Sequence, residues 1–466
     1  MNAIIFSAVA GIIMMFSGII TKNKSYLVNI ARVILAGLII VNILDTYGVA
    51  SIVIDSKSLL SFNKFGLFFN TICYSATFIY FLLSGDAVAK AGNYVAEYFA
   101  LIFFSLCGIA VLTAYNDLLM LFIGIEIMSI PLYILTGADK KNLKSNEASL
   151  KYFLMGCFST GILLMGITLV YGAVGNFHLP PLSGAVTGNP TANTNANSII
   201  EPLGLILIFV ALAFKVSAAP FHFWTPDVYD GAPSVFTSFM ATIIKAAGFF
   251  AFIKLFEWRS ATLGISWRII VSIIILATLL VGNITAVFQQ SVKRMLAYSS
   301  IAQAGFMLFA LYKVNDLSKE ALLLYTTAYS LATIGIFAIL IKIKDYTFEG
   351  YNGLAKKYPL LAAVNTICLL SLAGIPLTAG FFGKYFMLAA AFKAGTSILF
   401  LVIIAVLFAA VSVYYYFRVI QAMYLKEGDA EVAEFGNGFK MGLILVAALI
   451  IAIGIMPSII LNWFYF

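Results

Sequence analysis

The stretch LGLILIFVALAFKVSAAPFHF, residues 203–223, decides the architecture, because it is an apolar run that carries a lysine and is then interrupted. Lys215 lies deep in the run, and Pro220 follows five residues later, directly after the small residues Ser217, Ala218 and Ala219. Proline inside a helix removes a backbone hydrogen bond and clashes with the preceding turn. In hydrocarbon the freed carbonyl groups need partners within the protein or in a water-filled cavity. The stretch therefore predicts a broken transmembrane helix with a functional site at mid-depth.

A second apolar run, residues 359–391, has the same design. Gly374 and Pro376 interrupt it, and Lys384 follows the interruption. The two broken runs are spans 7 and 12 in our count, each the fourth span of a block of five if the blocks are spans 4–8 and 9–13. An odd number of spans in each block would make the second block inverted relative to the first, as in many transporters.

The composition agrees with a chain that lies almost wholly within a membrane. Of its 466 residues 62% are hydrophobic and only 10% are charged, and the mean hydropathy is +1.02. About fourteen apolar runs reach the roughly 20 residues that cross a bilayer. We expect an all-α polytopic membrane protein with two inverted five-helix repeats. The single integral membrane domain, 1–466, would comprise three N-terminal helices (1–90), the first repeat (95–256), the second repeat (266–425) and a C-terminal helix (438–466).

Loop charges give the expected orientation. Assigned to alternate sides, one face carries most of the loop lysines and arginines: Lys22, Lys24, Lys90, Lys140, Lys141, Lys144, Lys293, Arg294, Lys342, Lys344, Lys356, Lys357, Arg418, Lys426 and Lys440. The other face carries about half as many: Lys57, Lys64, Lys254, Arg259, Arg268, Lys313, Lys319 and Lys393. The positive-inside rule makes the first face cytoplasmic, or the matrix side in an organelle, and leaves both termini outside. The run at 2–20 lacks a positively charged start, so we expect a retained span.

Four ionisable side chains lie where hydrocarbon should exclude them: Glu126, Lys215, Lys245 and Lys384. A charged group near the bilayer centre is costly, so it faces a partner or a hydrated cavity and marks an ion or proton route. Burial favours the neutral form of each group, whereas a nearby opposite charge favours the charged form. A Glu126–Lys215 contact that can be made or broken is therefore expected to act as a switch, and the alternative is a static buried ion pair.

The three lysines and the glutamate can form a lateral row for proton transfer, in which Lys245 connects the two halves. Lys384 could instead reach outward to the membrane surface along its flexible stem. His222 lies two residues after the first break and can pass protons, or can simply pack in the core. The polar residues of spans 9 and 10 are expected mainly to hold helices together. They are Asn283, Gln289, Gln290, Tyr298, Ser299, Ser300 and Gln303.

The sequence offers no sign of a bound metal or redox cofactor. The four cysteines stand singly in apolar runs, without CxxC spacing or a histidine cluster. Neither a dinucleotide-binding GxGxxG after a strand nor a P-loop is present, and no basic tract indicates nucleic acid. The uncharged loop at 176–198 is expected to be flexible and without chemistry, and the acidic segment at 427–434 to be a solvated loop on the lysine-rich side.

Two longer motifs resemble a known family. PFHFWTPDVYDGAPSV (220–235) and SVKRMLAYSSIAQAGF (291–306) are similar to signature stretches of the antiporter-like membrane-arm subunits of respiratory complex I, the proton-pumping NADH:quinone oxidoreductase. The motif PDVYDGAP within the first stretch resembles the N branch of this family. The resemblance covers essentially the whole chain. It implies a Glu126–Lys215 pair, a connecting lysine at Lys245 and a terminal lysine at Lys384, where the M branch carries a glutamate.

What the resemblance implies is a proton-translocating subunit of the bacterial inner (plasma) membrane, or of the mitochondrial inner membrane if the chain is organellar. Other subunits would be its partners and would hold NADH, flavin, iron–sulfur clusters and quinone, while this chain would bind no cofactor. The rival reading is a subunit of a monovalent cation/proton antiporter. A Na⁺ site would want several oxygen ligands at mid-depth, and Glu126 is the only deep acid. A carrier of organic solutes would want a roomy site at the breaks, where the sequence has charged relays instead.

Overall fold

The computed structural model describes residues 1–49, 52, 58–179, 197–393 and 395–465. Within these ranges every named element is a helix, and β-structure is limited to isolated bridges such as the one between Ser291 and Thr347. The expectation of an all-α protein is therefore confirmed. Most of the loop at 176–198, expected to be flexible, lies outside the described residues.

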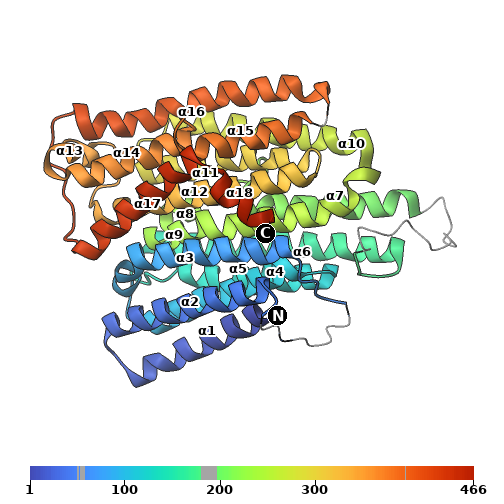
Figure 1. Ribbon diagram of the computed structural model, residues 1–466, viewed down its shortest axis with the longest axis horizontal. Coiled ribbons are helices and arrows are strands. Elements are labelled where there is room, and N and C mark those ends of the chain that lie inside the picture. The colour runs from blue at the N-terminus through green and yellow to red at the C-terminus, as the bar shows by residue number, and fades with distance from the viewer. Residues whose placement is uncertain (50–51, 53–57, 180–196, 394, 466) are drawn as a thin grey trace.

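The first six helices are long and run back and forth along the long axis of the molecule (Figure 1). They are α1 (Asn2–Ile20), α2 (Lys24–Thr46), α3 (Lys64–Lys90), α4 (Val95–Ala114), α5 (Leu118–Thr136) and α6 (Leu143–Val174). α1 and α2 lie at one edge of the bundle, and α3 lies between them and the later helices (Figure 1).

The remaining chain contains both broken spans and several short elements. Its α-helices are α7 (Asn197–Lys215), α8 (Trp224–Gly231), α9 (Ser234–Phe239), α10 (Lys245–Val287), α11 (Val292–Met307), α12 (Asp316–Lys342), α13 (Leu354–Lys357), α14 (Pro359–Ala373), α15 (Ala379–Phe392), α16 (Leu399–Leu425), α17 (Asn437–Ile455) and α18 (Ser458–Tyr465). A π-helix, η1 (Met240–Ile244), joins α9 to α10, and three 3₁₀-helices complete the set: η2 (Leu308–Leu311), η3 (Glu349–Tyr351) and η4 (Thr396–Ile398).

Eleven helical segments of the described chain are long and apolar enough to cross a membrane. The expected number of fourteen is not confirmed by this measure. The three other expected spans fall on α7 with α8, on the 16-residue α11, and on α14 with α15. Two of these three are interrupted, so their apolar residues are divided between shorter helices.

α10 contains parts of two expected spans in one 43-residue helix. The candidate spans on either side of its middle are Ser234–Glu257 and Ser266–Val287. The rings of Phe256 and Trp267 stack with centroids 4.2 Å apart, whereas eleven residues of straight helix would separate them by about 16 Å. The chain therefore turns back near 257–266, and the two halves of α10 serve as separate spans.

Both predicted helix breaks are present. α7 ends at Lys215, and Ser217 has a φ of 64° before the chain reaches Pro220. α14 ends at Ala373, Gly374 has a φ of 84°, and Leu377, directly after Pro376, has a φ of 70°. Residues with a side chain rarely adopt a left-handed conformation, and such residues cluster at functional sites.

The two five-span blocks share a close helix crossing. A Cβ atom added to Gly108 would lie 2.8 Å from the Cα of Met128, and one added to Gly282 would lie 2.8 Å from the Cα of Ala302. Gly282 and Ala302 follow Gly108 and Met128 by the same number of residues. The same backbone contact therefore recurs between α4 and α5 and between α10 and α11, which supports an internal repeat.

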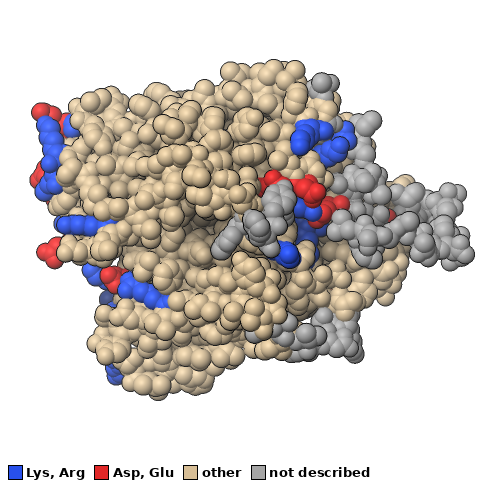
Figure 2. Space-filling view, in the orientation of Figure 1, with Lys and Arg blue, Asp and Glu red and all other residues tan. Residues whose placement is uncertain are grey.

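Charged side chains gather at the two ends of the helices, and the band between them is almost uncharged in the view of Figure 2. Four lysines that the sequence assigns to one side line a single cavity of about 500 Å³. They are Lys90, Lys144, Lys293 and Lys342. We call this the lysine-rich end. The nearly uncharged outer band confirms a polytopic membrane protein, with its exposed ionic groups gathered toward the two surfaces.

Candidate functional site

Lys215 is held by two hydroxyl groups of α5. Its Nζ donates to the Oγ of Ser129 at 3.1 Å and to the Oη of Tyr133 at 3.3 Å. The same ammonium lies 5.9 Å from the centre of the Tyr133 ring. Lys215 is the last residue of α7, so the break leaves its stem free to reach the neighbouring helix.

Glu126 lies on the same face of α5, one turn before Ser129. No ion pair within 4.0 Å joins Glu126 to Lys215 in the described part of the chain, and the buried Oε1 of Glu126 has no hydrogen-bond partner there. The structure therefore shows the expected pair in a separated arrangement, with two hydroxyls of α5 in place of the carboxylate.

Lys245 lies at the start of α10 and is only 1% exposed. Its Nζ donates to the carbonyl oxygen of Ser300 at 3.0 Å and to the Oγ of Ser300 at 2.8 Å. The π-helix η1 ends directly before Lys245. A π-helix contains an extra residue per turn and frequently marks a functional site.

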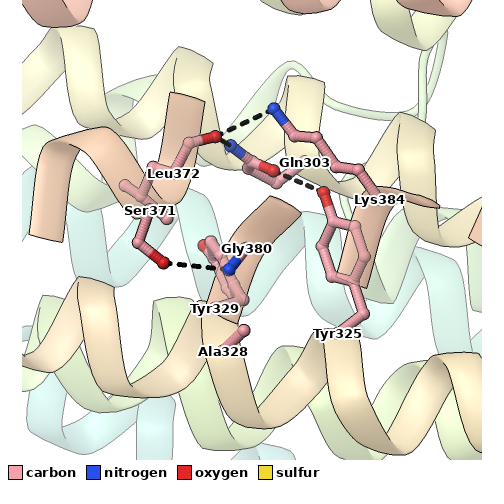
Figure 3. A pocket seen from close by; sticks show the side chains of 8 residues that line it. All are labelled: Gln303, Tyr325, Ala328, Tyr329, Ser371, Leu372, Gly380 and Lys384. Atoms are coloured by element: carbon pink, nitrogen blue, oxygen red, sulfur yellow. Dashed lines mark hydrogen bonds between the residues drawn. The ribbon is translucent and has the colours of Figure 1, made fainter. Parts of the chain in front are cut away.

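Lys384 binds the end of the helix that precedes it (Figure 3). Its Nζ donates to the carbonyl oxygens of Leu372 and Ala373, each at 2.9 Å, and lies 4.7 Å from the centre of the Phe306 ring. The C-terminal carbonyls of a helix have no partner within that helix. The side chain is 7% exposed and points to the break, so it does not reach outward to the surface.

A hydrogen-bonded network extends from Lys384 through Gln303 of α11. The Nε2 of Gln303 donates to the same Leu372 carbonyl at 2.9 Å, and Tyr325 donates to its Oε1 (Figure 3). The Nε2 also donates to the Oη of Tyr416 at 3.1 Å. Tyr416 also contacts Ser299. Gln303 thus links four helices, as expected of a residue that holds helices together. Its side-chain amide also lies beside Lys384.

α11 contacts both Lys245 and Lys384. Ser300 holds Lys245, Gln303 shares a carbonyl with Lys384 one turn later, and the Phe306 ring lies under Lys384. Residues three or four apart lie on one face of a helix. Successive turns of α11 therefore lie beside both lysines.

The residues that hold the lysines recur between the blocks. Counted by the spacing that relates Gly108 to Gly282, Glu126 corresponds to Ser300 and Ser129 corresponds to Gln303. Ser129 binds Lys215, and Gln303 lies beside Lys384. The second block therefore has neutral side chains in both positions, and only the first has a carboxylate.

Aromatic rings connect the surroundings of Lys215 to those of Lys245. Tyr133 meets Tyr152 edge-on at 4.8 Å, and Tyr152 stacks on Trp224 at 4.8 Å with an interplanar angle of 10°. Trp224 then meets Tyr229 at 5.9 Å, and the Nζ of Lys245 lies 6.0 Å from the centre of the Tyr229 ring. The region between these lysines is packed with rings, and the sequence did not indicate this.

His222 is 7% exposed, and its Nδ1 has no hydrogen-bond partner among the residues described. Its ring lies beside that of Phe223, 4.6 Å between centroids. The structure therefore does not join His222 to the row of lysines. A group of three or more histidine, cysteine or acidic side chains able to hold a metal is likewise not found in the described ranges.

Sequence reasoning missed Ser129 and Tyr133 as partners of Lys215. They lie three and seven residues after Glu126, which is the spacing of one helix face, so this periodicity could have identified them. The carbonyl partners of Lys384 have no such signal, because every residue has a carbonyl group.

Comparison with known proteins agrees with the motifs. The family model described as "NADH:quinone oxidoreductase/Mrp antiporter, TM" matches residues 115–412. A protein of Cytophaga hutchinsonii named NADH-quinone oxidoreductase subunit N is 37% identical, with 99% of each chain covered. The protein of the same name from Trichlorobacter lovleyi is 38% identical over 95% of this chain and 91% of its own. The resemblance seen at 220–235 and 291–306 is thereby confirmed.

Solved structures share the fold. A chain of respiratory complex I from Thermus thermophilus superposes with a TM-score of 0.83 at 29% identity, covering 99% of this chain and 98% of that one. A chain of an archaeal membrane-bound sulfane sulfur reductase gives 0.86 at 25% identity, covering 99% of this chain and 95% of that one. A chain of the Mrp complex from Dietzia sp. gives 0.85 at 17% identity, with 99% and 96% covered, and this last likeness concerns the fold alone.

Proposed function

Because the chain belongs to the NADH:quinone oxidoreductase/Mrp antiporter family and is related over its full length to subunit N, we propose that it translocates protons as subunit N of an NADH:quinone oxidoreductase. It is a membrane subunit of this enzyme, and the transfer of electrons from NADH to quinone takes place in other subunits. Those subunits are its partners and hold the flavin and the iron–sulfur clusters.

The observation that carries the proposal is the row of buried lysines. Lys215, Lys245 and Lys384 each bind neutral oxygen atoms, and none forms an ion pair within 4.0 Å among the described residues. An ammonium held this way inside hydrocarbon is costly to keep charged. Each lysine is therefore poised to exchange its proton when the charge of a neighbour changes.

We assign a role to each group. Glu126 and Lys215 form the switch: when the carboxylate approaches, it stabilises the charged lysine, and when it withdraws to the separated arrangement, the lysine releases its proton. Lys245 receives the proton between the blocks, and Lys384 passes it on. We assign His222, which is not joined to the row of lysines, a separate relay role beside the first break, because its Nδ1 has no hydrogen-bond partner among the described residues and can accept a proton.

The orientation follows from the charges. The lysine-rich end faces the cytoplasm, or the matrix in an organelle, and both termini face outward. The membrane is the bacterial inner membrane or its mitochondrial counterpart. Residues 1–90 and 438–466 flank the two repeats at 95–256 and 266–425. Moving one charge against 100 mV requires about 2.3 kcal/mol, and contacts with neighbouring subunits deliver this energy.

Cation/proton antiport is the alternative, because the matching family model includes the Mrp antiporter as well as NADH:quinone oxidoreductase. The carbonyl oxygens freed at the second break could bind a cation. In this chain Lys384 already occupies the carbonyls of Leu372 and Ala373. A fixed ammonium at that place repels Na⁺, which supports proton transfer over antiport.

The test uses the assembled complex in sealed vesicles. NADH oxidation should drive proton uptake, and Lys245→Ala should abolish most of it while leaving NADH oxidation by the peripheral subunits measurable. Exchange of Na⁺ for protons in vesicles without NADH would instead establish the antiporter. Normal proton uptake in an assembled Lys245→Ala complex would refute the proposed route.

A further inference from the structure

The cavity of about 500 Å³ at the lysine-rich end lies where three helices end. Ala87 and Lys90 of α3, Ser234 of α9, and Ile341 of α12 all line it. These helices pack against one another below the cavity. The junction of α3, α9 and α12 therefore leads from this cavity into the membrane region.

Six hydroxyl groups are buried along this junction. Four of them have no hydrogen-bond partner in the described part of the chain, whereas Tyr329 lies beside Thr333 and Ser300. We call the six groups the hydroxyl seam: Tyr80 and Ser84 of α3, Ser234 and Ser238 of α9, and Tyr329 and Thr333 of α12. All six residues are at most 7% exposed. Buried polar groups in native proteins are paired with protein or with ordered water, so this concentration requires an explanation.

Helix periodicity places each pair of the seam below the cavity. Ser84 and Tyr80 lie three and seven residues before Ala87, which lines the cavity. Thr333 and Tyr329 lie four residues apart on α12, so their side chains share one face of that helix. The hydroxyls of each helix are thus arranged one turn apart, from the cavity inward.

The seam residues of α9 lie between the cavity and Lys245. Ser234 lines the cavity, Ser238 follows one turn later, and Lys245 lies about 16 Å from Ser234 along the helix axis. The ring of Tyr80 contacts that of Phe239, with centroids 5.7 Å apart, so α3 meets α9 at this depth. At the inner end Tyr329 is close to Ser300, the residue that binds Lys245.

We propose that the hydroxyl seam is a hydrated inlet through which protons pass from the lysine-rich end to Lys245. Water molecules within it would satisfy the unpartnered hydroxyls and form a chain of proton donors and acceptors. The inlet includes α3, which lies outside both five-span blocks, so the first three helices contribute directly to transport. This role rests on the proposed function.

Cysteine accessibility tests the inlet without measuring transport. In a complex whose native cysteines are replaced, Ser84→Cys should react with a charged, membrane-impermeant thiol reagent added at the lysine-rich side. The matched control is Leu83→Cys, one residue away at the same depth and 5% exposed, whose side chain lies near Gly442 of α17 instead. We expect Ser84→Cys to react about ten-fold faster or more, because thiol reactivity requires access to water. Equal rates would overturn the inlet.

Two threonines on α12 test whether the inlet takes part in proton transport. Thr333 belongs to the seam, whereas the equally buried Thr326 donates its hydroxyl to the Leu322 carbonyl of its own helix at 2.7 Å. Thr333→Val should slow NADH-driven proton uptake about five-fold, the value of one lost hydrogen bond, and Thr326→Val should leave it unchanged. Equal rates in both variants, with Lys245→Ala inactive, would reject the inlet alone. Normal uptake in Lys245→Ala would reject the proposed function.

Discussion

Lys384 binds the carbonyl oxygen of Leu372 at 2.9 Å, so a charged side chain twelve residues later in the sequence closes the open end of α14. The same ammonium also binds the carbonyl of Ala373. In hydrocarbon a carbonyl without a partner is costly. Lys384 is therefore both a candidate proton carrier and part of the structure that makes the helix break possible.

This double role predicts a difference between two variants of Lys384. Lys384→Ala removes the donor from two carbonyls, at about 1–3 kcal/mol for each buried group left unpaired, so we expect lower thermal stability as well as lost proton pumping. Lys384→Arg keeps the donors but cannot release a proton. It should assemble normally and still pump poorly. The measurements are melting of the purified complex and proton uptake in vesicles. An Arg variant with full pumping would show that Lys384 is structural.

Replacing Glu126, unlike Lys384→Ala, should reduce proton pumping without reducing stability. Its Oε1 has no hydrogen-bond partner in the described ranges, so Glu126→Gln removes a charge without breaking a contact of that atom. We expect normal assembly and a loss of proton pumping of roughly 10-fold or more, typical of a group that transfers protons. Ser129→Ala, on the same helix face, is the matched control for a lost contact to Lys215. Near-normal pumping by Glu126→Gln would exclude the switch.

Two substitutions of Lys215 distinguish the role of its positive charge from the role of proton release. Lys215→Ala should pump less than Lys215→Arg, because arginine keeps a positive charge that Ser129 and Tyr133 can bind. Arginine should still fall short of the natural chain, because a guanidinium stays protonated. Pumping rates normalised to assembled complex decide the order. Full activity with arginine would assign this position to structure.

Coupling between Lys245 and Lys384 follows from their contacts with successive turns of α11. Neutralising both should cost less, on a logarithmic scale, than the two single losses added together, because the second change acts on a row that is already interrupted. Independent sites more than about 7–10 Å apart would add. Proton uptake by the two single variants and the double variant forms the cycle. Strict additivity would indicate two separate pathways.

The acidic segment at 427–434 should become easier to cleave at low pH. Lys344 donates to the Oε2 of Glu431 at 2.8 Å, and this hydrogen bond, with the lysine charge, lowers the pKa of Glu431 below its ordinary 4.5. Because the pKa is lower in the folded chain, the contact stabilises the loop above pH 4.5 and is lost as the pH falls through the folded value. Protease cleavage of this loop should therefore increase below pH 4.5, and Glu431→Gln should remove this dependence. An unchanged pH profile in that variant would contradict the assignment.

The sequence predicted the elements that depend on local residue type. Proline and glycine within apolar runs identified both breaks, and the deep lysines identified the row. It could not show that Glu126 and Lys215 are apart, because the distance between side chains on two helices depends on their packing. The sequence also predicted two spans within residues 234–287, but it did not show that the backbone stays helical through the turn near 257–266. Apolar periodicity is the same on both sides of such a turn.

The carbonyls that bind Lys384, and the ring series from Tyr133 to Tyr229, were beyond prediction for a related reason. Both arise where segments distant in the sequence meet, and neither requires an unusual residue type. The hydroxyls of α3 are a further case, since serine and tyrosine are ordinary residues of membrane helices, and only their lack of partners among the described residues distinguishes them.

The π-helix η1 means that the position of Lys245 depends on an extra residue inserted into the turn before it. A wide turn absorbs that residue, because a π-helix advances by a smaller angle per residue than an α-helix. If residues 240–244 adopted ordinary α-helical geometry, every later side chain would rotate by roughly 100°, the angle of one residue, about the helix axis. Lys245 would then face a different wall of the bundle, away from Ser300. The wide turn before Lys245 therefore directs this lysine to α11.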